Sequence, residues 1–166
     1  MATYGAQNVG ASRYDRLNKG IYSASLMGFG YSLLAFGVAW FFGRSLTGLF
    51  VSGGSSAQLV ELAQTYMITN VLAYPLLTLV NVVRFMIQGM GFSMFAILAG
   101  VMEMAARSLA GMFLVPALGY FGAALGSPLA WVAADLFLVP AYFRCRRVLM
   151  SQSHHLHVMG ENAELN

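Results

Sequence analysis

Two ionisable residues, Glu103 and Arg107, lie four positions apart in the apolar run GVMEMAARSLAG at residues 100–111. On an α-helix this spacing places both side chains on one face, where they form an ion pair. Two roles fit such a pair inside a membrane. Either it neutralises itself between helices, or Glu103 exchanges a proton or binds a cation in a water-filled cavity. The first role is favoured, because Arg107 already engages the negative charge of Glu103.

A second acid, Asp135, lies in the apolar stretch WVAADLFLVP and has no basic residue at helical spacing before Arg144. It is therefore the freer of the two carboxyl groups for binding a proton or a cation. The alternative is that Asp135 is capped or forms a bridge between helices. Asn81 and Arg84 complete the set of buried polar side chains, and Arg84 lies near enough to the QGMG turn for its charged end to reach water.

The sequence offers little for enzyme chemistry. It has no GxxxxGK[ST] phosphate loop and no HExxH, GxSxG or CxxC motif. The histidines, His154, His155 and His157, all lie in the C-terminal tail, where a solvated end is a commoner arrangement than a metal cluster. We therefore expect neither an enzyme nor a bound cofactor. If the chain moves solutes, an ion gradient of Na⁺ or H⁺ is the expected power source.

The composition indicates that lipid surrounds the chain. Of its 166 residues, 58% are hydrophobic and only 9% are charged, and the mean hydropathy is +0.68. Soluble domains carry about 25% charged residues. The basic residues form no aromatic-interleaved face, so the net charge of +3 gives no reason to expect nucleic acid as a partner. The expected partner is the lipid bilayer.

Four windows are long and apolar enough to cross a bilayer: residues 21–42, 66–87, 92–114 and 122–143. A helical span needs about 20 such residues. Four strands cannot close a barrel, so each window must be a helix. We expect an all-α integral membrane protein with four transmembrane helices at 21–147. A loop-like cytoplasmic segment precedes them at 1–20, and a polar cytoplasmic tail follows at 148–166.

The connections and small residues refine this arrangement. QGMGFS and VPALGYFG predict two tight helical hairpins, and the long loop between the first two spans is broken at GGSS, where Ser55 or Ser56 would cap the next helix. A stripe of small residues, spaced four apart, lets another helix approach closely; its members are Gly122, Gly126, Ala130 and Ala134. Three prolines inside the spans favour bends; they are Pro75, Pro128 and Pro140.

Charge predicts the orientation in the membrane. Four crossings put both termini and the QGMG turn on one side of the membrane. That side carries six basic residues near the membrane, whereas the other side carries only Arg44. The six are Arg13, Arg16, Lys19, Arg144, Arg146 and Arg147. The positive-inside rule then makes both termini cytoplasmic in a multi-pass plasma-membrane protein. At 1.5 Å per residue, Glu103 and Asp135 lie ~16 Å and ~13 Å from the cytoplasmic ends of their helices, near mid-membrane.

An ordered series of motifs resembles a known family. TYGAQNVGASRYDRLNKGI is similar to the loop between the eighth and ninth helices of the multidrug and toxic compound extrusion (MATE) family. VVRFMIQGMG resembles its tenth helix and following turn, EMAARSLAG its E-x-x-x-R eleventh helix, and ALGYFGAALGSPLAWVAAD its twelfth. The resemblance covers residues 2–147, so the four helices would be helices nine to twelve, part of the C-terminal lobe.

This resemblance implies a function. Members of the family have two six-helix lobes around a cleft and export amphipathic cationic drugs in exchange for Na⁺ or H⁺. The chain would then be a fragment or truncated form of such an antiporter, unable to transport without the missing N-terminal lobe or other subunits. Some members use an acid at the end of the tenth helix, and QGMGFS has none. Glu103 and Arg107 would correspond to the eleventh-helix pair, which would hold the lobe together.

Two alternatives stay open. The chain is a non-transporting membrane scaffold or assembly partner in which the pair has only a structural role, or it is a related lipid-oligosaccharide flippase. The candidate residues lining or bordering the lobe interior are the same in each case: Glu103, Arg107, Asp135, Asn81 and Arg84.

Overall fold

The computed structural model describes residues 1–50 and 57–164, and within them every element is a helix. The all-α prediction is therefore confirmed for this part of the chain. In chain order the elements are α1 (Ala2–Gly10), α2 (Asp15–Phe50), α3 (Ala57–Leu72), α4 (Tyr74–Gly89), α5 (Ser93–Leu109), the π-helical η1 (Ala110–Leu114), α6 (Val115–Leu118) and α7 (Tyr120–Glu164).

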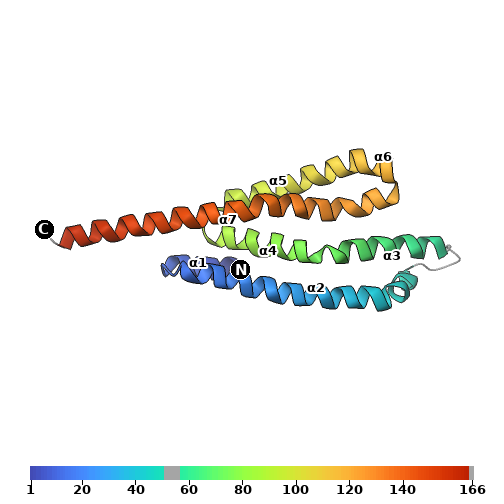
Figure 1. The fold of residues 1–166 in the computed structure, drawn as a ribbon, viewed down its shortest axis with the longest axis horizontal. Helices are drawn as coiled ribbons and strands as arrows, with labels where there is room; N and C mark the ends of the chain where they lie inside the picture. The colour runs from blue at the N-terminus through green and yellow to red at the C-terminus, as the bar shows by residue number, and fades with distance from the viewer. Residues whose placement is uncertain (51–56, 165–166) are drawn as a thin grey trace.

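The helices form four rods along a common long axis (Figure 1). The rods are α2, then α3 with α4, then α5 with η1 and α6, and finally α7. α4 packs against α1, α2, α5 and α7, and α7 also packs along α3 and α5. The N-terminus, the α4–α5 turn and the outgoing part of α7 lie toward one end, whereas α6 and the end of α2 lie toward the other. This is the up-and-down order expected from the sequence.

Three helical segments are long and apolar enough to span a membrane by themselves: Asp15–Leu49, Ser93–Leu118 and Tyr120–Gln152. Only α3 and α4 together are long and apolar enough to form a fourth span, and they are bent by 47° at their junction. The predicted span at 66–87 is thus broken at Ala73. Pro75 in the first turn of α4 causes the break, because proline has no N–H to donate to the carbonyl four residues earlier. Pro128 and Pro140, in contrast, lie inside the uninterrupted α7.

The expected loop at 1–20 is wrong, because α1 and the start of α2 occupy it. A nine-residue helix is marginal alone and needs tertiary packing. Here Gly5 and Asn8 are buried, and a Cβ added to Gly5 would lie 3.1 Å from the Met86 sulfur of α4. Close packing on α4 therefore stabilises α1. At the other terminus, α7 continues through the predicted polar tail to Glu164.

Both hairpin connections are short, as predicted. The α4–α5 turn needs only residues 90–92, with Gly91 at φ 92°. The expected VPALGYFG connection is mostly helical, and Gly119 at φ 59° alone separates α6 from α7. Glycine tolerates these left-handed conformations without steric cost. The second half of the long α2–α3 connection is helical from Ala57, as predicted, whereas the proposed Ser55 or Ser56 cap lies outside the described residues.

The small-residue stripe on α7 is partly used for close packing. A Cβ on Gly122 would collide with the Leu114 backbone, and Ala130 and Ala134 are fully buried, whereas a Cβ on Gly126 would meet nothing within 4 Å. Gly122→Ala should therefore lower the free energy of unfolding by about 1–3 kcal/mol, the range found for overpacking. Thermal unfolding in detergent measures the change. Gly126→Ala is the matched control and should melt at the original temperature or above it, since alanine favours helix. Equal melting of both variants would contradict the packing at Gly122.

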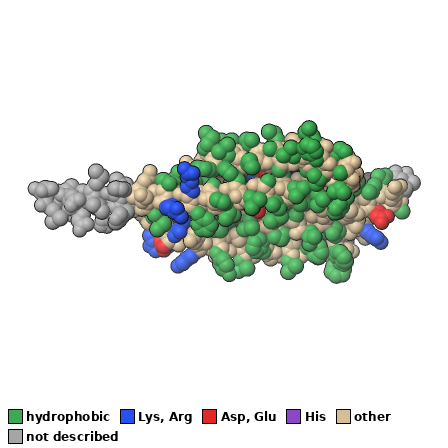
Figure 2. Space-filling view, turned by 45° about the horizontal axis from the view of Figure 1, so that its top comes forward, with side chains coloured by type: hydrophobic (Ala, Val, Ile, Leu, Met, Phe, Trp, Pro, Cys, Tyr) green, Lys and Arg blue, Asp and Glu red, His purple; other side chains and the backbone are tan. Residues whose placement is uncertain are grey.

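The outside of the rods is apolar along most of its length. Figure 2 shows hydrophobic side chains over the middle of the visible face, with basic side chains gathered toward one end. Large side chains are widely exposed, among them Leu33 at 73%, Phe41 at 79% and Leu136 at 73%. Soluble monomers rarely expose apolar surface on this scale. Lipid is the solvent that such a surface requires.

Candidate polar site between the helices

Glu103 lies between arginines from two helices. The Arg84 Nη2 of α4 donates to Oε1 of Glu103, and Nη2 of Arg107, on α5 itself, lies 3.5 Å from Oε2. The side chain of Glu103 is 13% exposed, against 23% for Arg84 and 50% for Arg107. The carboxylate is thus the buried centre of the cluster. Arg84 is its sheltered partner, and Arg107 is its peripheral one.

The hairpin geometry explains why Arg84 reaches Glu103. Arg84 lies five residues before the end of α4, and Glu103 lies ten residues after the start of α5. At 1.5 Å per residue these positions differ in depth by ~7 Å, a gap that an extended arginine side chain covers. Arg84 therefore points toward the bundle centre. The expectation that it reaches back to water at the QGMG turn is wrong, because a carboxylate on the neighbouring helix binds it instead.

The predicted Glu103–Arg107 pair is present, but it is the weaker of the two contacts. Its 3.5 Å separation is at the limit for a hydrogen bond, and Arg107 is half exposed. Spacing along one helix predicts the Arg107 contact. It does not predict the Arg84 contact, because Arg84 is 19 positions from Glu103 in the sequence. The antiparallel α4–α5 hairpin was the available signal, since it places these two helices side by side.

Asp135 of α7 is buried beside this cluster. The residue is 9% exposed, and neither carboxyl oxygen has a hydrogen-bond partner among the described residues. The charges that act on Asp135 are those of Glu103 and Arg84. Arg84 also leaves its buried Nε without a partner. The four side chains Arg84, Arg107, Glu103 and Asp135 form what we call the polar cluster. When all four are ionised, its two positive and two negative charges cancel.

The fifth candidate, Asn81, does not belong to the polar cluster. Its amide donates to the Leu77 carbonyl at 2.9 Å, one turn earlier on α4. It lines a separate cavity of ≈ 380 Å³ between α2 and α4, together with Ser32 and Thr78. This bond to its own helix satisfies part of the amide, and none of the hydrogen bonds between described residues joins Asn81 to Glu103.

The described residues contain no group of three or more His, Cys, Asp or Glu side chains that could hold a metal ion. His154, His155 and His157 lie outside the residues whose side chains are described, so the expectation of a solvated tail stays a prediction. Cys145 is a free, buried thiol. The chemistry available in the polar cluster is therefore binding of a proton, a cation or a water molecule by carboxyl groups.

Comparison with protein families gives a match. The family model MatE matches residues 1–104, which is more than half of the 166-residue chain. The matched segment runs from α1 to Glu103 and includes Arg84, whereas Arg107 and Asp135 lie beyond it. No curated protein and no solved structure matches the chain.

Proposed function

Because the chain belongs to the MATE family of membrane transporters, we propose that it forms part of a cation-coupled antiporter that exports amphipathic cationic compounds. The coupling ion would be Na⁺ or H⁺. The chain would lie in the plasma membrane with both termini in the cytoplasm, which is supported by the gathering of basic side chains toward the end of the rods that holds the N-terminus. The proposal that the four rods are helices nine to twelve rests on the motif series described above.

The observation that carries the proposal is the unpartnered carboxyl group of Asp135. Burying a polar group without a hydrogen bond is costly, and ionisable residues inside membrane helices commonly mark ion and proton pathways. Both oxygens of Asp135 are buried and lack a partner among the described residues. A coupling proton or cation bound there would satisfy them. Glu103 is a poorer carrier, since it already contacts two arginines.

Alternating access requires a second body that moves against the first. Transporters of this kind rock one repeat against another around a site near the bilayer midplane. The described residues supply at most four spans. We therefore propose that transport needs an N-terminal lobe or other subunits, and that the four rods do not export compounds by themselves.

A specific observation also favours a scaffold function. The Arg84–Glu103 contact joins α4 to α5, as a purely structural ion pair would. In that case the chain would support the assembly of a membrane complex without moving any compound. Asp135 distinguishes the two functions, since a scaffold has no use for a buried carboxyl group that lacks a partner.

Dye efflux tests the proposed function. Drug-sensitive cells that express the 166-residue chain alone should retain a cationic dye such as ethidium, whereas cells that express it joined to the first eight helices of a MATE transporter should export the dye. Fluorescence decay after dye loading gives the rate. A fusion that carries Asp135→Asn is the control for activity of the added helices. Export by the chain alone would contradict the requirement for a second lobe, and a fusion that accumulates without exporting would favour the scaffold.

A further inference from the structure

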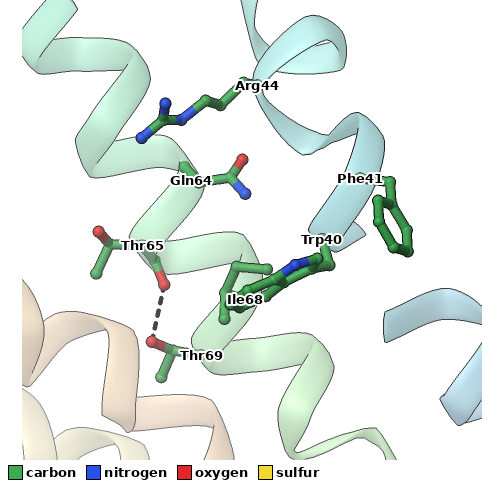
Figure 3. A pocket seen from close by; sticks show the side chains of 7 residues that line it. All are labelled: Trp40, Phe41, Arg44, Gln64, Thr65, Ile68 and Thr69. Carbon is green, nitrogen blue, oxygen red and sulfur yellow. Dashed lines mark hydrogen bonds between the residues drawn. The ribbon is translucent and has the colours of Figure 1, made fainter. Parts of the chain in front are cut away.

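A second polar feature lies near the opposite end of the rods, between α2 and α3. The cavity there has a volume of ≈ 530 Å³. Figure 3 shows Arg44 extending from α2 toward α3 beside Gln64, with the Trp40 indole next to Ile68. One part of the lining is therefore cationic and polar, and another part is apolar. This division matches a molecule that has a charged head and a hydrocarbon body.

Arg44 is available to bind an anion. None of the ion pairs among the described residues includes Arg44, and residues 51–56, which follow α2 in the chain, contain no acid. Glu61 and Arg44 line an adjacent cavity together without forming such a pair. None of the hydrogen bonds or ion pairs among the described residues uses the guanidinium, whose planar fork suits a phosphate group.

Three other polar side chains of this cavity donate hydrogen bonds within the protein. The Thr65 hydroxyl donates to the Glu61 carbonyl at 2.9 Å, and the Thr69 hydroxyl donates to the Thr65 carbonyl at 2.8 Å. The Gln64 amide donates to the Ala39 carbonyl at 3.3 Å. Arg44 is the charged residue in the lining and therefore the group that would hold an anion. The remaining polar side chains shape the space around it.

The position of the cavity along the membrane-spanning helices indicates the kind of ligand. Arg44 lies 23 residues after Ile21, where the apolar span of α2 begins, which at 1.5 Å per residue is ~34 Å along the helix and beyond a hydrocarbon core of ~30 Å. Trp40 is 60% exposed, and tryptophan is typical of the membrane interface. Lipid headgroups lie at this level, with their acyl chains beside the apolar residues below.

We propose that this cavity binds the phosphate of a glycerophospholipid from the leaflet opposite the termini. The phosphate lies against Arg44, and an acyl chain follows Trp40 and Ile68 toward the bilayer centre. A free phosphate ion has no apolar part that could contact the Trp40 indole. A cationic drug is repelled by Arg44. The site therefore selects a lipid with an anionic headgroup.

Native mass spectrometry of the full chain in detergent tests the proposal. The probes are dioleoyl phosphatidylglycerol, dioleoylglycerol with the same acyl chains but no phosphate, and inorganic phosphate. Phosphatidylglycerol should bind as a single retained molecule, and neither of the other probes should. Arg44→Gln should weaken this binding about tenfold, the effect expected from loss of charge-assisted hydrogen bonds.

Two further variants distinguish a specific binding site from nonspecific attraction of an anionic lipid to positive charge. Lys19→Gln removes the same charge near the other end of α2 and should leave the binding unchanged. Thr65→Phe fills the cavity without changing charge and should weaken the binding as Arg44→Gln does. The proposal is overturned if dioleoylglycerol or inorganic phosphate binds as well as phosphatidylglycerol. It is also overturned if Lys19→Gln weakens the binding as much as Arg44→Gln, or if folded Arg44→Gln or Thr65→Phe protein retains the lipid unchanged.

Discussion

Glu103→Gln should lower the free energy of unfolding by about 3–5 kcal/mol, the range for breaking a buried ion pair from one side. The substitution leaves Arg84 and Arg107 without the carboxylate that both contact. Arg84 is 23% exposed and cannot exchange its lost partner for bulk water. Denaturation in detergent micelles, followed by circular dichroism, gives the free energy. The amount of protein in membranes should fall with it.

Two control variants separate the contributions of the arginines. Arg107→Gln should cost less than Glu103→Gln, because it leaves the Arg84–Glu103 contact in place. The double variant Arg84→Gln, Glu103→Gln removes both buried charges and should be more stable than Glu103→Gln alone. Transport is measured in the fusion with the missing helices. If Glu103→Gln accumulates normally there but its export loses its pH dependence, Glu103 is a coupling residue instead of a structural one.

Much of the architecture followed from local properties of the sequence. Apolar windows of membrane length predicted the rods, because each residue in a helix contributes a fixed rise. The α4–α5 turn followed from QGMGFS, because the chain can reverse within residues 90–92 when Gly91 adopts positive φ. Ser93 then begins α5. These features depend on composition and on a few neighbouring residues, so they can be predicted without knowing the partners.

Features that depend on partners were not predictable in this way. α1 is short and has a polar sequence, and its helix is stabilised by packing against α4, where Gly89 lies so close to the Ala2 backbone that a Cβ would collide with it. The 47° bend between α3 and α4 was expected only as one of three proline effects. Whether a proline interrupts a helix depends on what surrounds it. Pro128 and Pro140 left α7 continuous.

The same distinction applies to the polar cluster. Helical spacing predicted the Arg107 contact, because residues four apart share a face. The Arg84 contact joins two helices, and it depends on their relative height and on the length of the arginine side chain. Asp135 was recognised as lacking a basic neighbour along its own helix. Its burial beside Glu103 and Arg84 emerged only from the packing of α7.

Asp135→Asn should abolish dye export by the chain joined to the first eight helices of a MATE transporter, reducing the rate to that of cells without the transporter. Asparagine keeps the size of the side chain but cannot exchange a proton or supply the negative charge that binds Na⁺. The free energy of unfolding should change by less than about 1 kcal/mol, since no hydrogen bond to either oxygen is lost. Efflux rate and denaturation in detergent are measured on the same variant.

The two readouts together distinguish a coupling carboxyl group from a structural one. Asp135→Glu retains an ionisable group in the same place, and it should preserve part of the export that Asp135→Asn removes. If Asp135→Asn instead destabilises the protein as much as Glu103→Gln, the carboxylate acts as the second counter-charge of the two arginines. A carboxyl group held in that way stays ionised throughout the cycle, because its loss of charge would leave Arg84 and Arg107 with only Glu103 between them. Coupling would then have to reside elsewhere in the transporter.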